Sequence, residues 1–277
     1  MESSEPTSDE VLAANISFHS ALAQDYDSNQ PHFRPENVAR VEGIVRRLAE
    51  ETGGGSLVDL GCGTGFVLNI AKRYFDRVVG VDITPDMLER VDTTGNVEVC
   101  LANTDSVPLP DGEFDACTAY GYLHHLYDLA PTLREAARLL RPGGRFFSDQ
   151  DPNQAYWAAL APLAGRPELT GFVAREVTAV TETDEVAAAQ TDLSPAQVRL
   201  AEYQKMRLGG FSAADVVDLF ESSGFSHAEH RYEWFLGQAV VLHDQSEKAS
   251  GVVESYLRAA LPVSAPLFKY VSFYATK

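Results

Sequence analysis

The chain has 277 residues, 45% of them hydrophobic, which suits one domain with insertions or one large and one small domain. Its formal net charge is −18, with 40 acidic against 22 basic side chains, so nucleic acid and anionic membranes are not expected as partners. No apolar run reaches the roughly 18 residues of a membrane helix, and the acidic start MESSEPTSDE, unlike a signal peptide, is expected to be disordered.

Strands and helices are expected to alternate through the first half of the chain. The expected strands cover residues 56–60, 77–82, 96–102, 113–120 and 144–148, and the expected helices cover 33–51, 64–73, a segment starting at 85, and 129–140. The helix that starts at 85 has a capping hydroxyl at Thr84 and proline at its first position. This βα order predicts a mostly parallel sheet with helices on both faces.

The alternation stops near residue 151 and resumes later. Residues 152–208 are expected to form a helical insertion, with one helix started by the capping box at 194–197. The expected parts are a flexible arm or lid at 1–32, a core at 33–151, this insertion, and a completion of the core at 209–277. The last part should contain a helix at 212–223, a strand at 227–235, an irregular insertion at about 236–266 and a final strand. The sheet should therefore have seven strands, with the last hairpin antiparallel.

Three glycines, each two residues apart, follow the first strand in the run VDLGCGTGF at 58–66. A phosphate-binding P-loop ends in Gly-Lys-Ser/Thr, which is missing here. A dinucleotide-binding fingerprint has its third glycine where Phe66 stands. Asp59, at the end of the strand, would repel a pyrophosphate and would favour a cationic ligand group such as an ammonium.

Two more carboxylates follow the neighbouring strands. Asp82 ends the second strand, where ligands of open α/β sheets bind, and is placed to accept both hydroxyls of a ribose. Asp105 follows the third strand and is placed to accept a hydrogen bond from the exocyclic amine of an adenine. Together with Asp59, they outline a site for S-adenosylmethionine (SAM), which has a ribose, an adenine, an ammonium and a sulfonium.

The sequence resembles the class I SAM-dependent methyltransferases, in the branch with ubiquinone/menaquinone-biosynthesis and small-molecule natural-product methyltransferases. The resemblance rests on VDLGCGTG at 58–65, VVGVDITPDML at 78–88, DSVPLPDGEFD at 105–115 and LLRPGGRFF at 139–147, in the family's order and spacing. It implies a Rossmann-like fold and SAM as cofactor. The residues it assigns to SAM are Asp59, Gly61 and Gly63 for the methionine part, with Cys62 as a small filler, Asp82 for the ribose, Ile83, Met87, Asp105 and Ser106 for the adenine, Tyr120 beside the sulfonium, and Tyr26 as a lid residue.

Two histidines follow the fourth strand, where an acceptor would meet the cofactor. His125 is the preferred candidate for a general base and His124 the second, because histidine titrates near neutral pH. Alternatively, the pair orients the acceptor or packs against the next helix. His19 and His32 in the N-terminal arm either face the site or, as is usual for lone histidines in an arm, are solvated. Asp149, Asp151 and Asn153 offer three oxygens to magnesium, but an ordinary turn is favoured and no metal is expected.

The insertions carry aromatic residues that either cap the site or pack among themselves: Tyr156, Trp157, Phe172, Tyr203, Tyr256 and Phe268. The spacing of 252, 256 and 260 favours a packed helix face. An aromatic cap suggests a bulky acceptor, and three cysteines without metal-ligand spacing suggest a reduced, cytoplasmic protein.

The sequence thus predicts a monomeric or homodimeric enzyme of secondary metabolism that methylates an oxygen, nitrogen or carbon of an aromatic, quinone or polyketide-like molecule. The alternatives are a SAM-binding protein of the same fold with a non-methylating reaction, such as a cyclisation, or with a regulatory role.

Overall fold

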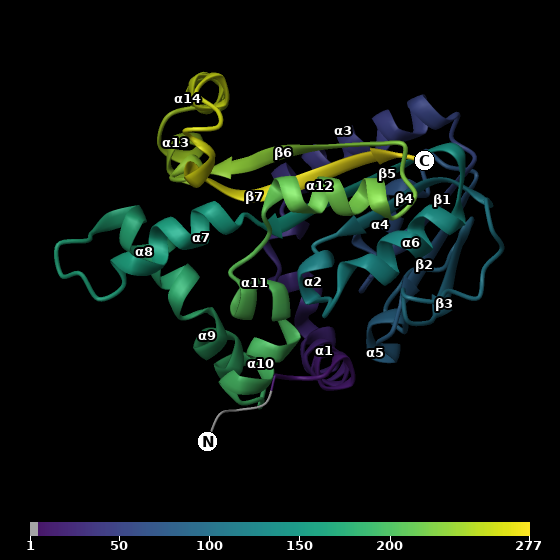
Figure 1. The fold of residues 1–277 in the computed structure, drawn as a ribbon, viewed down its shortest axis with the longest axis horizontal. Helices are drawn as coiled ribbons and strands as arrows, with labels where there is room; N and C mark the ends of the chain where they lie inside the picture. Colours follow the sequence, from purple (N-terminus) through teal and green to yellow (C-terminus); the bar gives the residue numbers. More distant parts are fainter. Residues whose placement is uncertain (1–4) are drawn as a thin grey trace.

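A seven-stranded sheet forms the centre of the protein, whose computed structural model describes residues 5–277 (Figure 1). Its strand order is β3-β2-β1-β4-β5-β7-β6, and β7 runs antiparallel to both of its neighbours, while β1 to β5 are parallel. The strands are β1 (Ser56–Leu60), β2 (Arg77–Asp82), β3 (Val97–Leu101), β4 (Phe114–Tyr120), β5 (Leu140–Pro152), β6 (His227–Phe235) and β7 (Phe268–Thr276). The predicted seven-stranded, mostly parallel sheet with its antiparallel last hairpin is confirmed.

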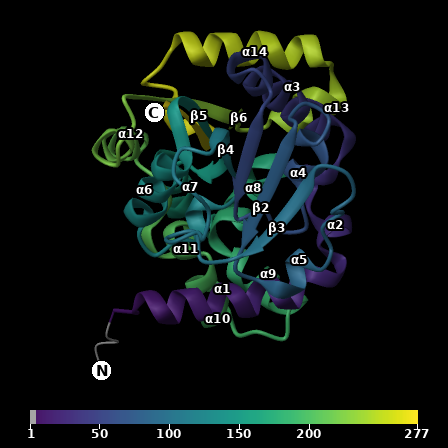
Figure 2. The same cartoon turned by 90° about the vertical axis from the view of Figure 1, so that its right-hand side faces the viewer.

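Helices cover both faces of this sheet because the strands are apolar on both sides. Leu57 packs with α3 (Pro35–Thr52) and α4 (Phe66–Ala71), whereas its neighbour Val58 packs with α6 (Leu129–Leu139) and α12 (Ala213–Ser222) on the opposite face. Figure 2 shows α4 on one side of the sheet and α6 with α12 on the other. Fully buried side chains such as Leu57 each contribute about 1.5–3 kcal/mol, which fixes the strand ends that carry the site.

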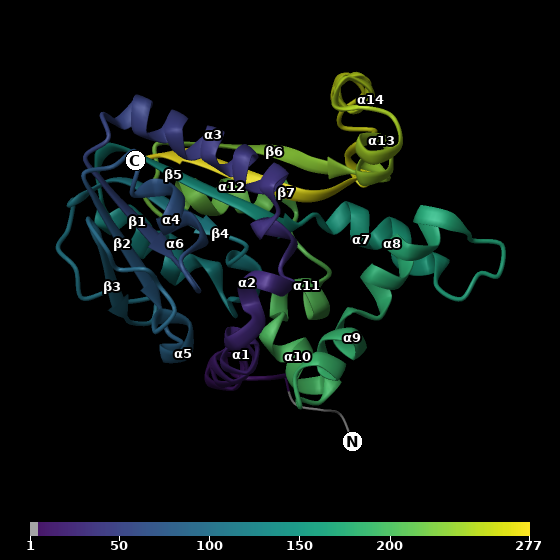
Figure 3. The ribbon, with the colours of Figure 1, turned by 180° about the vertical axis from the view of Figure 1, so that it is seen from behind.

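The N-terminal segment folds into helices: α1 (Ser8–Leu22), η1 (Ala23–Asp25), α2 (Tyr26–Asn29) and η2 (Pro31–Phe33). Thr7 and Glu10 form a capping box that starts α1, so the expected disorder is wrong for residues 8–10, and residues 1–4 lie outside the described part of the chain. Phe18 of α1 packs against Val198 of the insertion, and α1 lies beside α10 in Figures 1 and 3. The N-terminal segment therefore contacts the insertion as well as the core.

The first insertion is helical, as predicted. It contains α7 (Gln154–Leu160), η4 (Ala161–Leu163), α8 (Gly171–Thr181), α9 (Thr183–Gln190), α10 (Pro195–Ala201) and α11 (Tyr203–Leu208). The predicted capping box of Ser194 and Gln197 starts α10. In Figures 1 and 3, α7 and α8 extend away from the sheet, and α10 returns to α1. No helix in the described part of the chain is long and apolar enough to cross a membrane.

The second insertion, expected to be irregular, instead forms α13 (Gln238–Asp244), α14 (Glu247–Ala259) and η5 (Ala265–Leu267). The prediction of a packed face on α14 is wrong, because Val252 is 49% and Tyr256 73% exposed, and Ala260 is exposed too. The final strand β7 is hydrogen-bonded on both sides, to β5 and to β6, so it is not an edge of the sheet.

Candidate functional site

A cavity of about 890 Å³ lies at the carboxyl ends of β1, β2 and β4. Most of the residues predicted from the sequence line it: Tyr26, Asp59, Gly61, Cys62, Gly63, Asp82, Ile83, Asp105, Tyr120, His124 and His125. Its remaining wall includes residues of α1, α2, η2, α4, α6, α7, α8, α9 and α11, of the end of β5 and of the start of β7. This volume is within the range of pockets that hold small molecules and cofactors.

Two predicted residues are missing from the cavity wall. Met87, on α5 (Pro85–Leu88), is 1% exposed and does not line the cavity. Ser106 is also outside it, and its backbone N–H already donates to the carbonyl of Asn103 at 3.1 Å. Asn103 lines the cavity in this region. The cavity therefore gives no support to the adenine contacts predicted for Met87 and Ser106.

The glycine loop after β1 uses its backbone N–H groups inside the protein. Gly61 and Cys62 donate to the carbonyl of Val81 at 2.8 and 3.0 Å, and Gly63 donates to Asp82 Oδ2 at 2.9 Å. A phosphate-binding loop needs such N–H groups free to point at the anion. These three N–H groups are therefore not free to bind an anion, and the loop does not favour a phosphate.

Gly61 makes room for a tyrosine of the protein itself. Its φ is +71°, and an added Cβ would collide with the ring of Tyr122. The hydroxyl of Tyr122 hydrogen-bonds Thr104 at 2.6 Å, Thr104 hydrogen-bonds Thr132 at 3.0 Å, and Thr132 donates to Asp105 Oδ1 at 2.7 Å. The glycine thus allows a row of hydroxyls that fixes Asp105 at the cavity wall.

Asp82 joins two loops at the end of β2. Its Oδ2 accepts from the Gly63 N–H, and its Oδ1 accepts from the Thr84 N–H at 2.8 Å. Each carboxylate oxygen keeps a second lone pair, so both remain able to accept a hydroxyl hydrogen. The carboxylate is thereby pre-oriented at the cavity wall, as a bidentate contact to a diol requires.

Asp59 is a buried acid without a cation. It is 2% exposed, and Oδ1 accepts a hydrogen bond from the Thr118 hydroxyl at 2.6 Å. Burial, followed by the nearby charge of Asp82, raises the pKa of Asp59 to about 7 even though the Thr118 hydroxyl lowers it. Within residues 5–277, no ion pair involves Asp59, Asp82 or Asp105. This end of the cavity therefore fits a ligand group that brings its own positive charge.

The N-terminal helices are attached to the site by polar contacts. Asp27, next to the cavity-lining Tyr26, accepts from the Thr64 hydroxyl at 2.5 Å. On α1, the Asn15 side chain donates to the carbonyl of His125 at 2.9 Å. Burial raises the pKa of Tyr26 above its ordinary value, with the charges of Glu202, Asp82 and Asp27 adding to the effect. These contacts hold the N-terminal helices over the glycine loop.

The two arm histidines, His19 and His32, are half-buried and line the cavity, which agrees with the alternative that they face the site. The rings of His19 and His125 are 4.7 Å apart, edge to face. His32 contacts the rings of Phe66 at 4.8 Å and Tyr120 at 5.8 Å, and burial lowers its pKa to about 4. A neutral imidazole in this aromatic group closes the cavity over the start of α4.

His124 and His125 lie on η3 (Leu123–His125) and have different partners. His125 Nδ1 is 2.8 Å from the carbonyl of Ala201, so Nδ1 donates and Nε2 keeps its lone pair. His124 lies between two carboxyls, with Nδ1 3.1 Å from Asp151 Oδ1 and Nε2 3.8 Å from Glu202 Oε2. Burial lowers the pKa of His125 to about 4 and that of His124 well below its usual range. His125 therefore offers the more available basic nitrogen.

Glu202, between α10 and α11, is a cavity-lining residue that the sequence analysis missed. Burial raises its pKa, but the charges of Lys205, His125 and His124 prevail and hold it below the usual range. Its ligand atom and those of the two histidines lie within 4.8 Å of one another, a grouping compatible with a metal ion. However, Lys205 Nζ lies 2.8 Å from Glu202 Oε2 and supplies the positive charge there. The absence of a metal stays a prediction.

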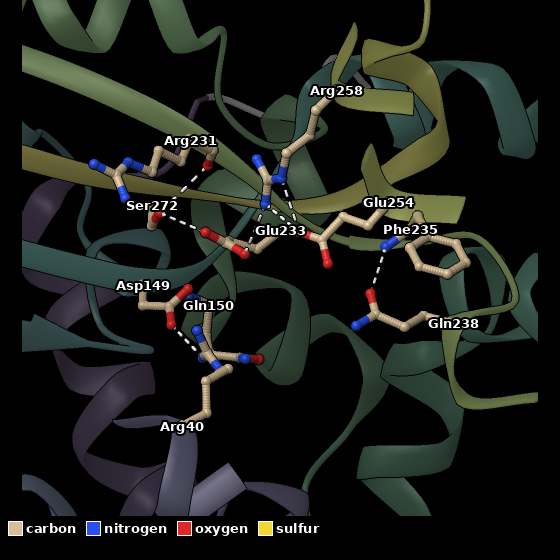
Figure 4. A network of polar contacts seen from close by, with 10 residues as sticks. All are labelled: Arg40, Asp149, Gln150, Arg231, Glu233, Phe235, Gln238, Glu254, Arg258 and Ser272. Carbon is tan, nitrogen blue, oxygen red and sulfur yellow. Dashed lines mark hydrogen bonds and ion pairs between the residues drawn. The ribbon is translucent and has the colours of Figure 1, made fainter. Parts of the chain in front are cut away.

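The three residues considered for magnesium have separate partners. Asp149 pairs with Arg40 of α3 (Figure 4), Asp151 faces the histidine pair, and Asn153 caps α7. The expected turn is wrong, because β5 continues to residue 152 with a bulge at Gln150, whose φ is 66°. The bulge and the Arg40 pair hold the cavity wall that follows β5.

A second group of charges lies beside the Arg40 pair in Figure 4. Glu233 of β6 pairs with Arg258 of α14 at 3.3 Å and accepts from the Ser272 hydroxyl at 3.4 Å. Arg258 also pairs with Glu254 at 2.6 Å. Burial raises the pKa of Glu233, and the negative charge of Asp149 raises it further. These contacts attach the second insertion to the sheet, outside the cavity.

The aromatic residues of the insertions mostly pack among themselves. Tyr156 and Trp157 belong to an apolar cluster of α7 and α8, and Tyr203 lies 5.1 Å from the ring of Tyr127. Of those predicted as a cap, Trp157 lines the cavity, and Tyr270 does so without having been predicted. Residues 236–266 contribute nothing to the wall. Of the two insertions, the first lines the cavity, together with the N-terminal helices and the start of β7.

Several known proteins are similar to this chain in sequence. Residues 58–148 match the family model "Methyltransferase domain". A probable S-adenosylmethionine-dependent methyltransferase of Mycolicibacterium smegmatis is 27% identical, over 77% of this chain and 74% of its own length. The 27-O-demethylrifamycin SV methyltransferase of Amycolatopsis mediterranei is 31% identical, over 50% of this chain and 57% of its own length. The chain thus matches little more than half of the second protein.

Solved structures share the fold. A S-adenosylmethionine-dependent methyltransferase of Mesorhizobium loti covers 85% of this chain, and 96% of its own chain is matched, with a TM-score of 0.52 and 20% identity. Phosphoethanolamine N-methyltransferase 2 of Haemonchus contortus, solved with S-adenosyl-L-methionine, covers 100% of this chain with 61% of its own, at a TM-score of 0.58 and 14% identity. At these identities, the likeness supports the fold alone.

Proposed function

We propose that the chain is a class I SAM-dependent methyltransferase and that it methylates an oxygen, nitrogen or carbon of a bulky small molecule. An aromatic, quinone or polyketide-like acceptor is the class we infer. The observation that carries the proposal is the acidic end of the cavity, where Asp59, Asp82 and Asp105 lack cations and the N–H groups of Gly61, Cys62 and Gly63 are paired inside the protein.

The residues at this end fit SAM. Of the three acids, Asp59 fits SAM best, because the ammonium of SAM would stabilise the ionised form of this buried carboxyl, whose pKa is raised. The carbonyls of Gly61 and Gly63 would accept from the same ammonium. Asp82 would accept the two ribose hydroxyls through the oxygens that Gly63 and Thr84 orient.

The adenine and sulfonium positions follow along the wall. Ile83 and Asp105 line the cavity beside the ribose position and would contact the adenine ring and its exocyclic amine. Tyr120 would border the sulfonium, and Tyr26 would cover the cofactor from α2. Cys62 would fill the loop, and its pKa, raised by burial, keeps the thiol protonated and unreactive.

SAM supplies an electrophilic methyl group when it is bound. The protein's part is to hold the acceptor in line, to exclude water and to remove a proton where the acceptor is a hydroxyl. His125 Nε2 is placed to take that proton, because its pKa of about 4 leaves it neutral above this pH. The carboxylate of Glu202 stabilises the imidazolium that forms, while His124 and α1 hold His125 in place.

The biological setting is part of the same proposal. The similarity to a 27-O-demethylrifamycin SV methyltransferase supports a place in secondary metabolism. The three cysteines are free, which suits a reducing cytoplasm, and the net charge of −18 suits neither nucleic acid nor anionic membrane. We expect a monomer or a homodimer.

The test uses SAM labelled in its methyl group, with panels of aromatic, quinone and polyketide acceptors. The proposal expects label in an acceptor and an equal amount of released S-adenosylhomocysteine, both lost in Asp82→Ala. A SAM-binding protein with a non-methylating or regulatory role would instead bind SAM and transfer no label to any acceptor. That result would refute methyl transfer while leaving the cofactor site intact.

A further inference from the structure

The acidic and the basic residues that line the cavity come mostly from different parts of the chain. The acids from the strand-end loops are Asp59, Asp82, Asp105 and Asp128, and no lysine or arginine from residues 5–128 lines the cavity. The basic lining residues, Arg175, Lys205 and Lys269, all come from the first insertion and the start of β7, with Glu202 as the one acid among them. The cavity therefore has an acidic end for the cofactor and a basic end.

The basic residues differ in how well their charge is compensated. Lys205 is paired with Glu202 at 2.8 Å, beside the histidines. Lys269 Nζ lies 2.9 Å from Glu176 Oε2, an oxygen that also accepts from the Tyr156 hydroxyl at 2.9 Å. Glu176 itself does not line the cavity.

Arg175 is left without a counter-charge. It is exposed on α8 and lines the cavity, and within the described residues it has no ion pair and no side-chain hydrogen bond. Lys269 is compensated by Glu176, so Arg175 brings to the cavity a positive charge that no ion pair of the described residues neutralises.

We propose that the acceptor carries a carboxylate, which Arg175 and Lys269 bind while its reacting atom lies at His125. The inference rests on the proposed function and specifies its substrate class. The planar guanidinium of Arg175 matches a carboxylate with two parallel hydrogen bonds. A protein of net charge −18 repels acids over most of its surface, so these local cations are what an acidic acceptor requires.

The position of the basic end agrees with this assignment. Figures 1 and 3 show α8 and the start of β7 at one end of the molecule, and β2 and β3 at the other. The cofactor residues follow β1, β2 and β3, so the two ends of the cavity serve different ligands. An elongated acceptor would place its carboxylate away from the methyl group, so the carboxylate orients the acceptor and is not methylated.

The experiment compares acids with their primary amides, which have nearly the same shape but no charge. The probes are benzoate, 2-naphthoate and 4′-hydroxybiphenyl-4-carboxylate, each paired with its amide. Ligand-observed NMR titration measures their binding to the full chain saturated with S-adenosylhomocysteine. At least one acid is expected to bind about tenfold more tightly than its amide, and the preference should shrink as salt rises.

Two variants decide whether Arg175 is responsible. Arg175→Gln should reduce the preference for the acid to about twofold or less, with unchanged S-adenosylhomocysteine affinity and Tm. Arg166→Gln is the matched control, because Arg166 is also exposed in the insertion but does not line the cavity, and it should keep the preference. The proposal is overturned if no acid is preferred to its amide, or if the preference survives in Arg175→Gln. Binding of S-adenosylhomocysteine, measured separately, tests the cofactor site and distinguishes its failure from this one.

Discussion

Asp59 should make the affinity for S-adenosylhomocysteine depend on pH. Burial and the charge of Asp82 raise the pKa of Asp59 to about 7, so this carboxyl is partly protonated near neutral pH. The ligand's ammonium, which stays charged across this range, favours the ionised carboxylate and lowers that pKa on binding. Binding therefore releases a proton whenever Asp59 is protonated beforehand.

The size of the effect follows from the raised pKa. With a pKa of about 7, Asp59 is about 90% ionised at pH 8 and about 10% ionised at pH 6. If only the ionised form binds well, Kd at pH 6 should be about ten times that at pH 8, or about 1.4 kcal/mol. About 0.9 proton should be released per ligand bound at pH 6 and about 0.1 at pH 8. His32 and His125 have pKa values of about 4 and do not contribute in this range.

Calorimetric titration in buffers of different ionisation enthalpy measures the affinity and the proton release together. Asp59→Asn should bind more weakly at pH 8 and lose the pH dependence between pH 6 and 8. A wild-type Kd that is constant over this range, with no proton release, would refute the reasoning. It would mean that Asp59 is already ionised or lies away from the ligand's ammonium.

Three further predictions, the last with a control variant, test other parts of the account. Asp82→Ala should weaken SAM binding by more than about tenfold, because the ribose contacts are lost; an unchanged titration would remove Asp82 from that role. His125→Ala should lower kcat by about 10²-fold or more with unchanged S-adenosylhomocysteine affinity, whereas wild-type turnover would make His125 structural. Arg40→Met leaves the carboxylate of Asp149 buried and unpaired, and should cost about 3–5 kcal/mol in urea unfolding. Arg46→Met, which removes an exposed ion pair of the same helix, should cost less than about 1 kcal/mol; equal losses would contradict the reasoning.

The cofactor end of the cavity was predictable because it depends on short patterns. An apolar strand that ends in an acid places that acid at the sheet edge whatever the rest of the fold, as Asp59 and Asp82 show. Parallel pairing then brings the two strand ends together, with Asp59 opposite Gly80 in the register. The glycine loop was placed correctly for the same reason.

The rest of the cavity could not be predicted from short patterns, because it depends on contacts between segments that are far apart in the sequence. Gly61 is needed because Tyr122, 61 residues later, occupies the space above it. Glu202 and Arg175 enter the cavity only because the insertion helices return to it, and neither belongs to a recognisable motif. The exposed face of α14 was mistaken for a packed one, because helical spacing of Val252 and Tyr256 does not show what lies opposite.

The central claim is that the acidic strand ends bind a sulfur nucleotide, and parallel calorimetric titrations with SAM, S-adenosylhomocysteine and NAD test it most directly. The account predicts micromolar binding of the first two and none of NAD, because a pyrophosphate needs free N–H groups and those of Gly61, Cys62 and Gly63 are already paired inside the protein, beside two carboxylates. Binding of NAD, or of neither sulfur nucleotide, would contradict it.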